Sequence, residues 1–234
     1  MNAVGRVLRS KDDARLSYNR LSRWYDLLSG NFEKKHRAVG LGKLAARPGE
    51  RMLEIGFGTG HCILALAEAV GEAGKVCGID LSDGMLAVTR QRLAKAGLSD
   101  RVDLRRGDAL HLPFEASSFD GVFMSFTLEL FDTPEIPRVL EGCRTVLKPG
   151  GRLVLMALVR KPWRAVRIYE WFHEKMPGIV DCRPIHAQAD LAAAGFKVSG
   201  VTAASIWGLP VEIILAVKAH RGGTVGQALP GSTL

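Results

Sequence analysis

The sequence of 234 residues lacks the patterns that mark several classes of protein. It has four cysteines, and none stands in a C-x-x-C pair or at the spacing of a zinc site. No apolar run approaches the roughly 20 residues of a membrane span, and the start shows no apolar segment typical of a secretory signal. We therefore expect reduced, structural cysteines, no metal site and a cytoplasmic protein with one domain of ordinary size.

Positive charge is plentiful but unevenly placed. Residues 1–51 account for +7 of the net charge of +8, because they hold 12 Lys and Arg against 5 Asp and Glu. The remaining residues hold 20 Lys and Arg against 19 Asp and Glu. The basic segment also carries apolar and aromatic side chains, which is typical of a helix that packs on a domain. It could also form a lid and contact an anionic membrane surface from the inner side. No RNA-binding motif accompanies the charge, so we expect no nucleic acid partner.

The most informative segment is an apolar run that ends in alternating glycines. Residues 52–55 read as a strand, the next five read Gly-Phe-Gly-Thr-Gly, and apolar residues at helical spacing follow to Val70. Such a strand–turn–helix lets backbone N–H groups approach a nucleotide where a Cβ would interfere. The dinucleotide pattern G-x-G-x-x-G does not fit, because His61 stands where its third glycine would be. The glycines instead run G-x-G-x-G, with Glu54 two residues before the first.

Further acids stand at the ends of later predicted strands. Asp80 closes a second strand over 75–79, where a carboxylate can accept hydrogen bonds from both hydroxyls of a ribose. Ser82 is a candidate N-cap for the next helix. A third strand ends in Gly107-Asp108-Ala109, a fourth covers 119–125, and the turn Leu-Lys-Pro-Gly-Gly at 147–151 leads into a fifth.

These motifs, in this order, resemble the class I S-adenosylmethionine (SAM) methyltransferases. The resemblance implies an α/β, Rossmann-like, doubly wound sheet of seven strands in the order 3-2-1-4-5-7-6, with strand 7 antiparallel and helices on both faces. It also implies that Asp108 takes the adenine amino group and that the backbone N–H of Ala109 meets the ring. The cofactor-binding residues it implies are Glu54, Gly56, Gly58, Gly60, Asp80, Leu81, Met85, Asp108, Ala109 and Ser125.

We divide the chain into three parts. Residues 1–47 are expected to form a basic helical extension or lid, with helix breaks at residues 29–31 and at Gly40. Residues 48–218 form the methyltransferase domain, in which 161–184 are a helical insertion over the active site, and 219–234 form a flexible tail rich in Gly, Ser and Thr.

The acceptor of the methyl group is less readable. The chain is similar to the ubiquinone and menaquinone biosynthesis methyltransferases over residues 18–217, mainly in the cofactor half. That group typically has an Arg-Asn pair in the loop after strand 4, and this chain has Glu129-Leu130 there. A small or lipid-like acceptor such as a quinone precursor is therefore one prediction. Alternatives are the head-group amine of phosphatidylethanolamine, a soluble small molecule, and a non-catalytic SAM-binding domain. No catalytic base is evident, and the weak candidates are His111, Glu129 and Tyr25.

Overall fold

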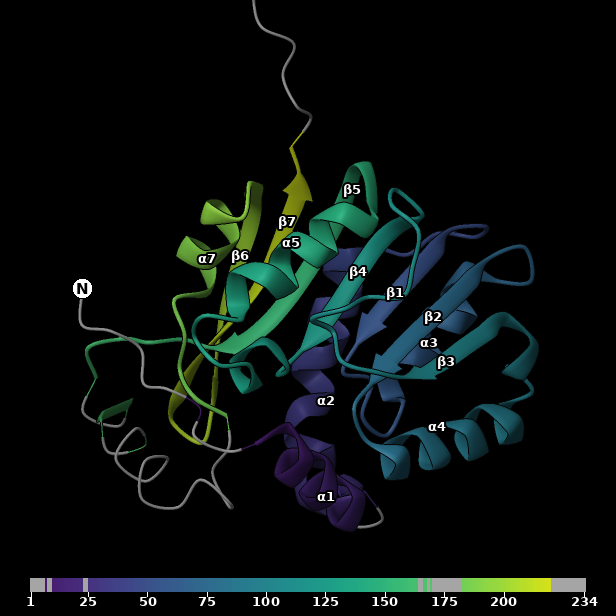
Figure 1. The fold of residues 1–234 in the computed structure, drawn as a ribbon, viewed down its shortest axis with the longest axis horizontal. Helices are drawn as coiled ribbons and strands as arrows, with labels where there is room; N and C mark the ends of the chain where they lie inside the picture. Colours follow the sequence, from purple (N-terminus) through teal and green to yellow (C-terminus); the bar gives the residue numbers. More distant parts are fainter. Residues whose placement is uncertain are drawn as a thin grey trace, which may run out of the picture.

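The chain folds around one seven-stranded sheet that separates two layers of helices (Figure 1). The computed structural model describes residues 7, 10–22, 25–163, 166–167, 169 and 182–219. The described strands are β1 (Arg51–Ile55), β2 (Lys75–Asp80), β3 (Val102–Arg106), β4 (Phe119–Ser125), β5 (Leu147–Leu158), β6 (Phe196–Ile206) and β7 (Leu209–Lys218). The described helices of seven residues or more are α1 (Lys11–Leu21), α2 (Tyr25–Leu44), α3 (His61–Val70), α4 (Asp83–Ala96), α5 (Ile136–Val146) and α7 (Ala187–Ala193).

The strand order is β3-β2-β1-β4-β5-β7-β6, which confirms the predicted topology. Strands β1 to β5 pair in parallel, and β7 runs antiparallel to both of its neighbours, β5 and β6. Because β1 pairs with β2 on one side and β4 on the other, the strand order reverses direction beside β1. In open α/β sheets ligands bind at such a switch point, outside the carboxyl ends of the strands.

Two apolar clusters fill the space between the sheet and its helices. In Figure 1, α5 and α7 lie on the near face of the sheet, while α2 and α3 lie behind it. The near cluster joins residues of α5 and α7 to β4 and β5, and the far cluster joins α3 and the end of α2 to β2, β5 and β7. The strands between them are buried on both faces, which explains their nearly continuous apolar sequences.

The expected helix breaks in the N-terminal extension are wrong. A single helix, α2, runs from Tyr25 to Leu44 through residues 29–31 and Gly40. Gly40 is needed for close packing, because a Cβ there would lie 2.7 Å from Met156 Sδ and 3.1 Å from a ring carbon of Phe123. This glycine lets the helix approach β4 and β5, so tertiary packing outweighs its low helix propensity.

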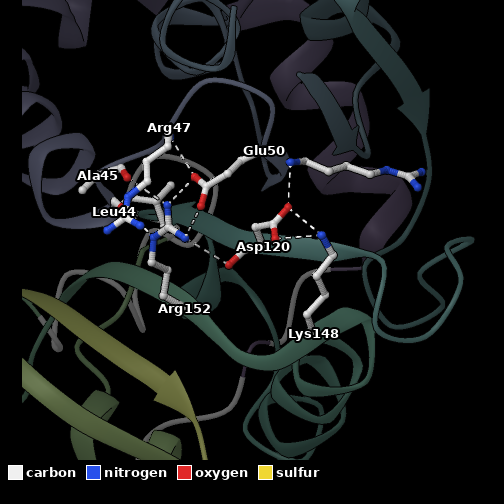
Figure 2. A network of polar contacts seen from close by, with 8 residues as sticks. Leu44, Ala45, Arg47, Glu50, Asp120, Lys148 and Arg152 are labelled. Carbon is white, nitrogen blue, oxygen red and sulfur yellow. Dashed lines mark hydrogen bonds and ion pairs between the residues drawn. The ribbon is translucent and has the colours of Figure 1, made fainter. Parts of the chain in front are cut away.

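Ionic contacts join the end of α2 to the amino end of the sheet (Figure 2). Arg152 makes a two-pronged contact with Glu50, at 2.6 and 2.9 Å, and also donates to the carbonyl oxygens of Leu44 and Ala45. Lys148 contacts both oxygens of Asp120, at 2.7 and 2.9 Å. The Leu-Lys-Pro-Gly-Gly segment therefore has a structural role, since Lys148 within it and Arg152 directly after it fasten this end of the molecule.

Two predicted segments remain untested. Most of the expected insertion at 161–184, and all but the first residue of the expected tail at 219–234, lie outside the described residues. Among the helices that the structure describes, none is both long enough and apolar enough to cross a bilayer.

Candidate functional site

The glycine turn between β1 and α3 is built from three residues with positive φ. Gly56, Gly58 and Gly60 have φ of 72°, 51° and 84°. A Cβ on Gly56 would overlap Thr127, and one on Gly60 would lie 2.5 Å from Thr89 Cγ2, so these two glycines are needed for packing within the protein. A Cβ on Gly58 would meet nothing within 4 Å. The middle glycine therefore faces open space, and it is where the backbone can approach a ligand.

Asp80 holds this turn from the next strand. Its Oδ2 accepts a hydrogen bond from the amide of Gly58 at 2.9 Å, and its Oδ1 accepts one from the amide of Ser82 at 2.9 Å. Burial raises the pKa of Asp80, and hydrogen bonds from three backbone amides lower it by less, so the net shift is upward. The carboxylate is partly exposed and retains lone pairs for further donors.

Glu54 lies in β1, one residue before the strand ends, and its charge is poorly compensated. Its side chain is 2% exposed, and Oε2 has no hydrogen-bond partner in the described part of the structure. Burial raises the pKa of this carboxyl well above its ordinary value, repulsion from Asp80 adds to the shift, and Arg37 opposes it. A buried carboxyl in this condition would be stabilised by a ligand that brings a positive charge.

Asp108 follows β3 and already has two partners. Its Oδ1 accepts from the amide of Leu110 at 3.0 Å, and its Oδ2 accepts from Lys11 Nζ at 2.7 Å. Ala109 beside it is 6% exposed. Because β3, β2 and β1 are neighbours in the sheet, Asp108 and Asp80 lie at the same edge as the glycine turn. The structure thus brings together the acids that the sequence placed in one site.

The other predicted cofactor residues take different positions. Leu81 follows Asp80 directly and is partly exposed, whereas Met85 is 2% exposed and belongs to the far core cluster. Ser125 ends β4 beside β1, and its carbonyl oxygen accepts from Thr127 Oγ1 at 2.9 Å. Met85 therefore supports the site from within the core, while Ser125 lies at the switch point.

The three weak catalytic candidates do not form a group. His111 is exposed, and its Nε2 lies 3.5 Å from Arg138 Nη2 on α5. Glu129 is fully buried, and its Oε1 accepts from the amide of Leu158 at 3.2 Å, which ties the loop after β4 to the end of β5. The side chain of Tyr25 lies outside what the structure describes. No arrangement of these residues in the described structure identifies a general base.

Sequence reasoning missed the contribution of α1. Three polar residues of α1 contact segments at the carboxyl end of the sheet: Lys11, Arg15 and Asn19. Their spacing of four residues was visible in the sequence and places them on one face of a helix. What the sequence could not show is which loops this polar face would meet.

Comparison with known proteins agrees with this geometry. Residues 52–151, which hold the glycine turn and all three acids, match the family described as a methyltransferase domain. Residues 52–151 therefore have the sequence of a methyltransferase domain. The resemblance seen in the sequence is confirmed, and SAM is the cofactor of that family.

Curated relatives and solved structures match this methyltransferase domain. A demethylmenaquinone methyltransferase of Symbiobacterium thermophilum is 36% identical over 155 residues, which are 64% of this chain and 61% of that protein. A 2-phytyl-1,4-naphtoquinone methyltransferase of Synechococcus elongatus is 35% identical over 58% of this chain and 57% of that protein. The crystal structure of the [4+2]-cyclase SpnF superimposes with a TM-score of 0.75 and 19% identity, covering 94% of this chain and 99% of that one. The chain spans about three fifths of the length of the curated relatives it matches.

The residues of the site fit SAM. Gly58 offers an open backbone surface, and Asp80 and Asp108 offer carboxylates at adjacent strand ends. Glu54 adds a buried acid that would be stabilised by the ammonium of the methionine part. Among the described residues there is no group of three or more His, Cys, Asp or Glu that could hold a metal ion.

Proposed function

We propose that this protein transfers the methyl group of SAM to a quinone-type acceptor. The observation that supports SAM as the methyl donor is the arrangement of Gly58 and Asp80. A 2.9 Å hydrogen bond joins them beside the buried acid Glu54. The names of the curated relatives support the acceptor half, because they act on demethylmenaquinone and on 2-phytyl-1,4-naphtoquinone.

When bound, SAM supplies an electrophilic methyl group on a sulfonium sulfur. The protein's tasks are to hold this cofactor, align the acceptor and exclude water. In our proposal Asp80 accepts hydrogen bonds from the ribose, Asp108 accepts one from the adenine amino group, and Glu54 faces the ammonium. The glycine turn brings backbone close to the methionine part. The acceptor, in its reduced phenolic form, would supply the electron pair of the new bond to the methyl carbon and then lose a proton, while the sulfur would keep the electron pair of the broken bond.

The acceptor loop after β4 differs from the pattern of the quinone group, and the structure gives the difference a physical meaning. Glu129 stands where that group typically has a basic residue, yet its side chain is fully buried and bonded to the amide of Leu158. We infer that Glu129 fixes the position of this loop and does not present its charge to a phenolate. The charge reversal in the sequence is thus compatible with a quinone-type acceptor.

The alternatives remain distinct predictions. A phosphatidylethanolamine head group would need a site for a cationic amine, and a soluble acceptor would need neither lipid nor quinone. A non-catalytic SAM-binding domain is a third option, and the similarity to the [4+2]-cyclase SpnF shows that this fold also occurs in a protein that is not named a methyltransferase.

We also propose peripheral contact with an anionic membrane through residues 1–47, and the described side chains support it in part. Lys11 and Arg15 are engaged in ion pairs within the chain, whereas Arg20, Lys34 and Lys35 are exposed. Trp207, at the turn between β6 and β7, is 70% exposed. Both residues of that turn, Trp207 and Gly208, have positive φ, at 51° and 78°.

A vesicle experiment tests this contact. Sedimentation with anionic vesicles should exceed that with neutral ones and should fall as salt rises. Trp207→Asn should weaken binding without harming the fold, since Asn-Gly suits a two-residue turn with positive φ. Binding that is indifferent to lipid charge and to salt would remove the proposal.

A radiolabelled methyl-transfer screen tests the proposed function. Labelled SAM is offered with a demethylmenaquinone, phosphatidylethanolamine or an aqueous metabolite pool, and Asp80→Ala serves as the control for the cofactor site. We expect label in the extracted quinone and much less label with the control. Label in phosphatidylethanolamine or in the aqueous pool alone would replace the quinone proposal with the corresponding alternative.

A further inference from the structure

One polar face of α1 is docked on the loops around the cofactor site. Lys11, Arg15 and Asn19 are spaced by four residues and so share a helix face. Lys11 Nζ lies 2.7 Å from Asp108 Oδ2 and 2.8 Å from Glu135 Oε1. Arg15 Nη1 lies 3.2 Å from Asp83 Oδ2.

The last turn of α1 holds the loop after Asp80. Asn19 Oδ1 accepts hydrogen bonds from Ser82 Oγ at 2.6 Å and from the amide of Gly84 at 2.9 Å. Before the helix, the amide of Val7 donates to Asp132 Oδ1 at 3.1 Å. These contacts reach the segments that follow β2, β3 and β4, so α1 extends across the end of the sheet toward which β1 and β2 point in Figure 1.

The two ends of α1 are held in different ways. At the carboxyl end the packing is close, because Ser22 is 5% exposed and a Cβ on Gly84 would lie 3.0 Å from the Asn19 Cα. At the amino end, besides the hydrogen bond from Val7, the side-chain contacts with the domain are ion pairs, and the side chains of Lys11, Asp108 and Glu135 are 41%, 26% and 26% exposed. Of residues 11–20, none is buried. Ion pairs this exposed contribute little stability and weaken with salt, so the amino end of α1 can detach more readily than its packed carboxyl end.

We propose that α1 is a latch over the cofactor site, that Lys11 closes it by bridging Asp108 and Glu135, and that cofactor exchange requires this bridge to break. The proposal rests on the proposed function, because it takes Asp108 as the acid that meets the adenine. The Asp108 carboxylate has about four lone-pair positions, and two are used by Lys11 and the Leu110 amide. An adenine amino group can therefore join Lys11 on Asp108 without displacing it, and the closed latch covers a bound cofactor.

Exchange kinetics of S-adenosylhomocysteine test the latch. The variants are Lys11→Met, which removes the bridge, Lys11→Arg, which preserves the charge, and Glu135→Gln, which weakens the bridge without touching Asp108. The matched control is Lys34→Met, the same change at an exposed lysine of α2. Dissociation is followed by displacement with excess unlabelled ligand, association by stopped flow, and helix content and Tm confirm that each variant is folded.

We expect Lys11→Met to raise the dissociation rate about tenfold and the association rate several-fold, so that affinity changes less than either rate. Glu135→Gln should act in the same direction, and Lys11→Arg and Lys34→Met should stay within about twofold of the wild type. Raising the salt concentration should speed dissociation from the wild type more than from Lys11→Met.

Two outcomes would overturn the latch while leaving the proposed function intact. In one, the wild type binds S-adenosylhomocysteine and Lys11→Met exchanges it at the wild-type rate. In the other, dissociation rises but association does not, which would make Lys11 an ordinary ligand contact. A wild type that binds neither SAM nor S-adenosylhomocysteine would instead overturn the proposed function, and the latch with it.

Discussion

The amide of Gly58 donates a hydrogen bond to Asp80 Oδ2 at 2.9 Å across 22 residues of sequence. This contact joins the glycine turn to the end of β2 without any ligand. It positions the carboxylate beside the open backbone at Gly58. A nucleoside site of this fold uses such a carboxylate to bind the ribose hydroxyls next to a glycine turn.

Asp80→Ala should therefore weaken the binding of SAM. We expect a loss of about 1–3 kcal/mol, the usual scale for removing a charged hydrogen-bond partner. Equilibrium dialysis with labelled SAM measures it, and the melting temperature shows whether the loop remains folded. An unchanged Kd in a folded variant would mean that the ribose lies elsewhere.

The glycines of the turn should respond differently to alanine. Gly58→Ala places a Cβ in open space at a φ of 51°, so we expect a modest stability loss of about 1–2 kcal/mol and at least a tenfold loss of cofactor affinity. Gly56→Ala adds a collision with Thr127 to a similar strain, so it should lose about 2–4 kcal/mol of stability. Denaturant unfolding and ligand titration on both variants separate the two effects. Full cofactor affinity in Gly58→Ala would contradict the placement of the ligand.

Glu54→Gln should increase the stability of the ligand-free protein in a pH-dependent way. The folded-state pKa of Glu54 is raised above 4.5, so the folded state binds more protons than the unfolded state as pH rises above that value. Stability of the wild type should therefore fall with rising pH, and the advantage of the variant should grow until the folded-state pKa is passed. Urea unfolding between pH 4.5 and 8 measures the difference. The same variant should bind SAM more weakly, because the ammonium loses its partner; tighter binding would contradict the role given to Glu54.

Arg152→Met should destabilise the protein more at neutral pH than in acid. Burial raises the pKa of Glu50, but the hydrogen bonds and charge of Arg152 and the amide of Arg47 lower it by more, so the net shift is downward. A carboxyl with a lowered pKa contributes stability above its unfolded pKa of about 4.5, and this stability is lost as pH falls through the folded-state pKa. We expect a loss of about 1–3 kcal/mol at pH 7 that shrinks toward pH 3. A loss of equal size at both pH values would point to packing of the arginine stem instead.

The resemblance to SAM methyltransferases implied the strand order, whereas the glycine turn and the acids at the strand ends were visible as local signals in the sequence. The turn after β1 uses three residues with positive φ, which favours glycine at each of them. An acid at the end of the neighbouring parallel strand β2 lies at the same edge of the sheet as this turn. Gly40 shows where local signals fail, because a glycine that reads as a helix break is instead a point of close contact with Met156.

The sequence predicted a helical extension or lid at residues 1–47, but the contacts of α1 could not be predicted, for a different reason. Its contacts join residues far apart in sequence, 97 residues for Lys11 with Asp108 and 63 for Asn19 with Ser82. They are made by polar side chains, which carry no apolar periodicity to reveal a buried face. The position of Glu129 could not be predicted either. Only the structure shows that its carboxylate accepts a hydrogen bond from the amide of Leu158.

Calorimetric titration of the wild-type protein with SAM, S-adenosylhomocysteine and NAD decides whether the glycine turn and Asp80 form a SAM site. We expect the two sulfur nucleosides to bind at one site per chain and NAD not to bind. Binding of NAD without either sulfur nucleoside would contradict this expectation.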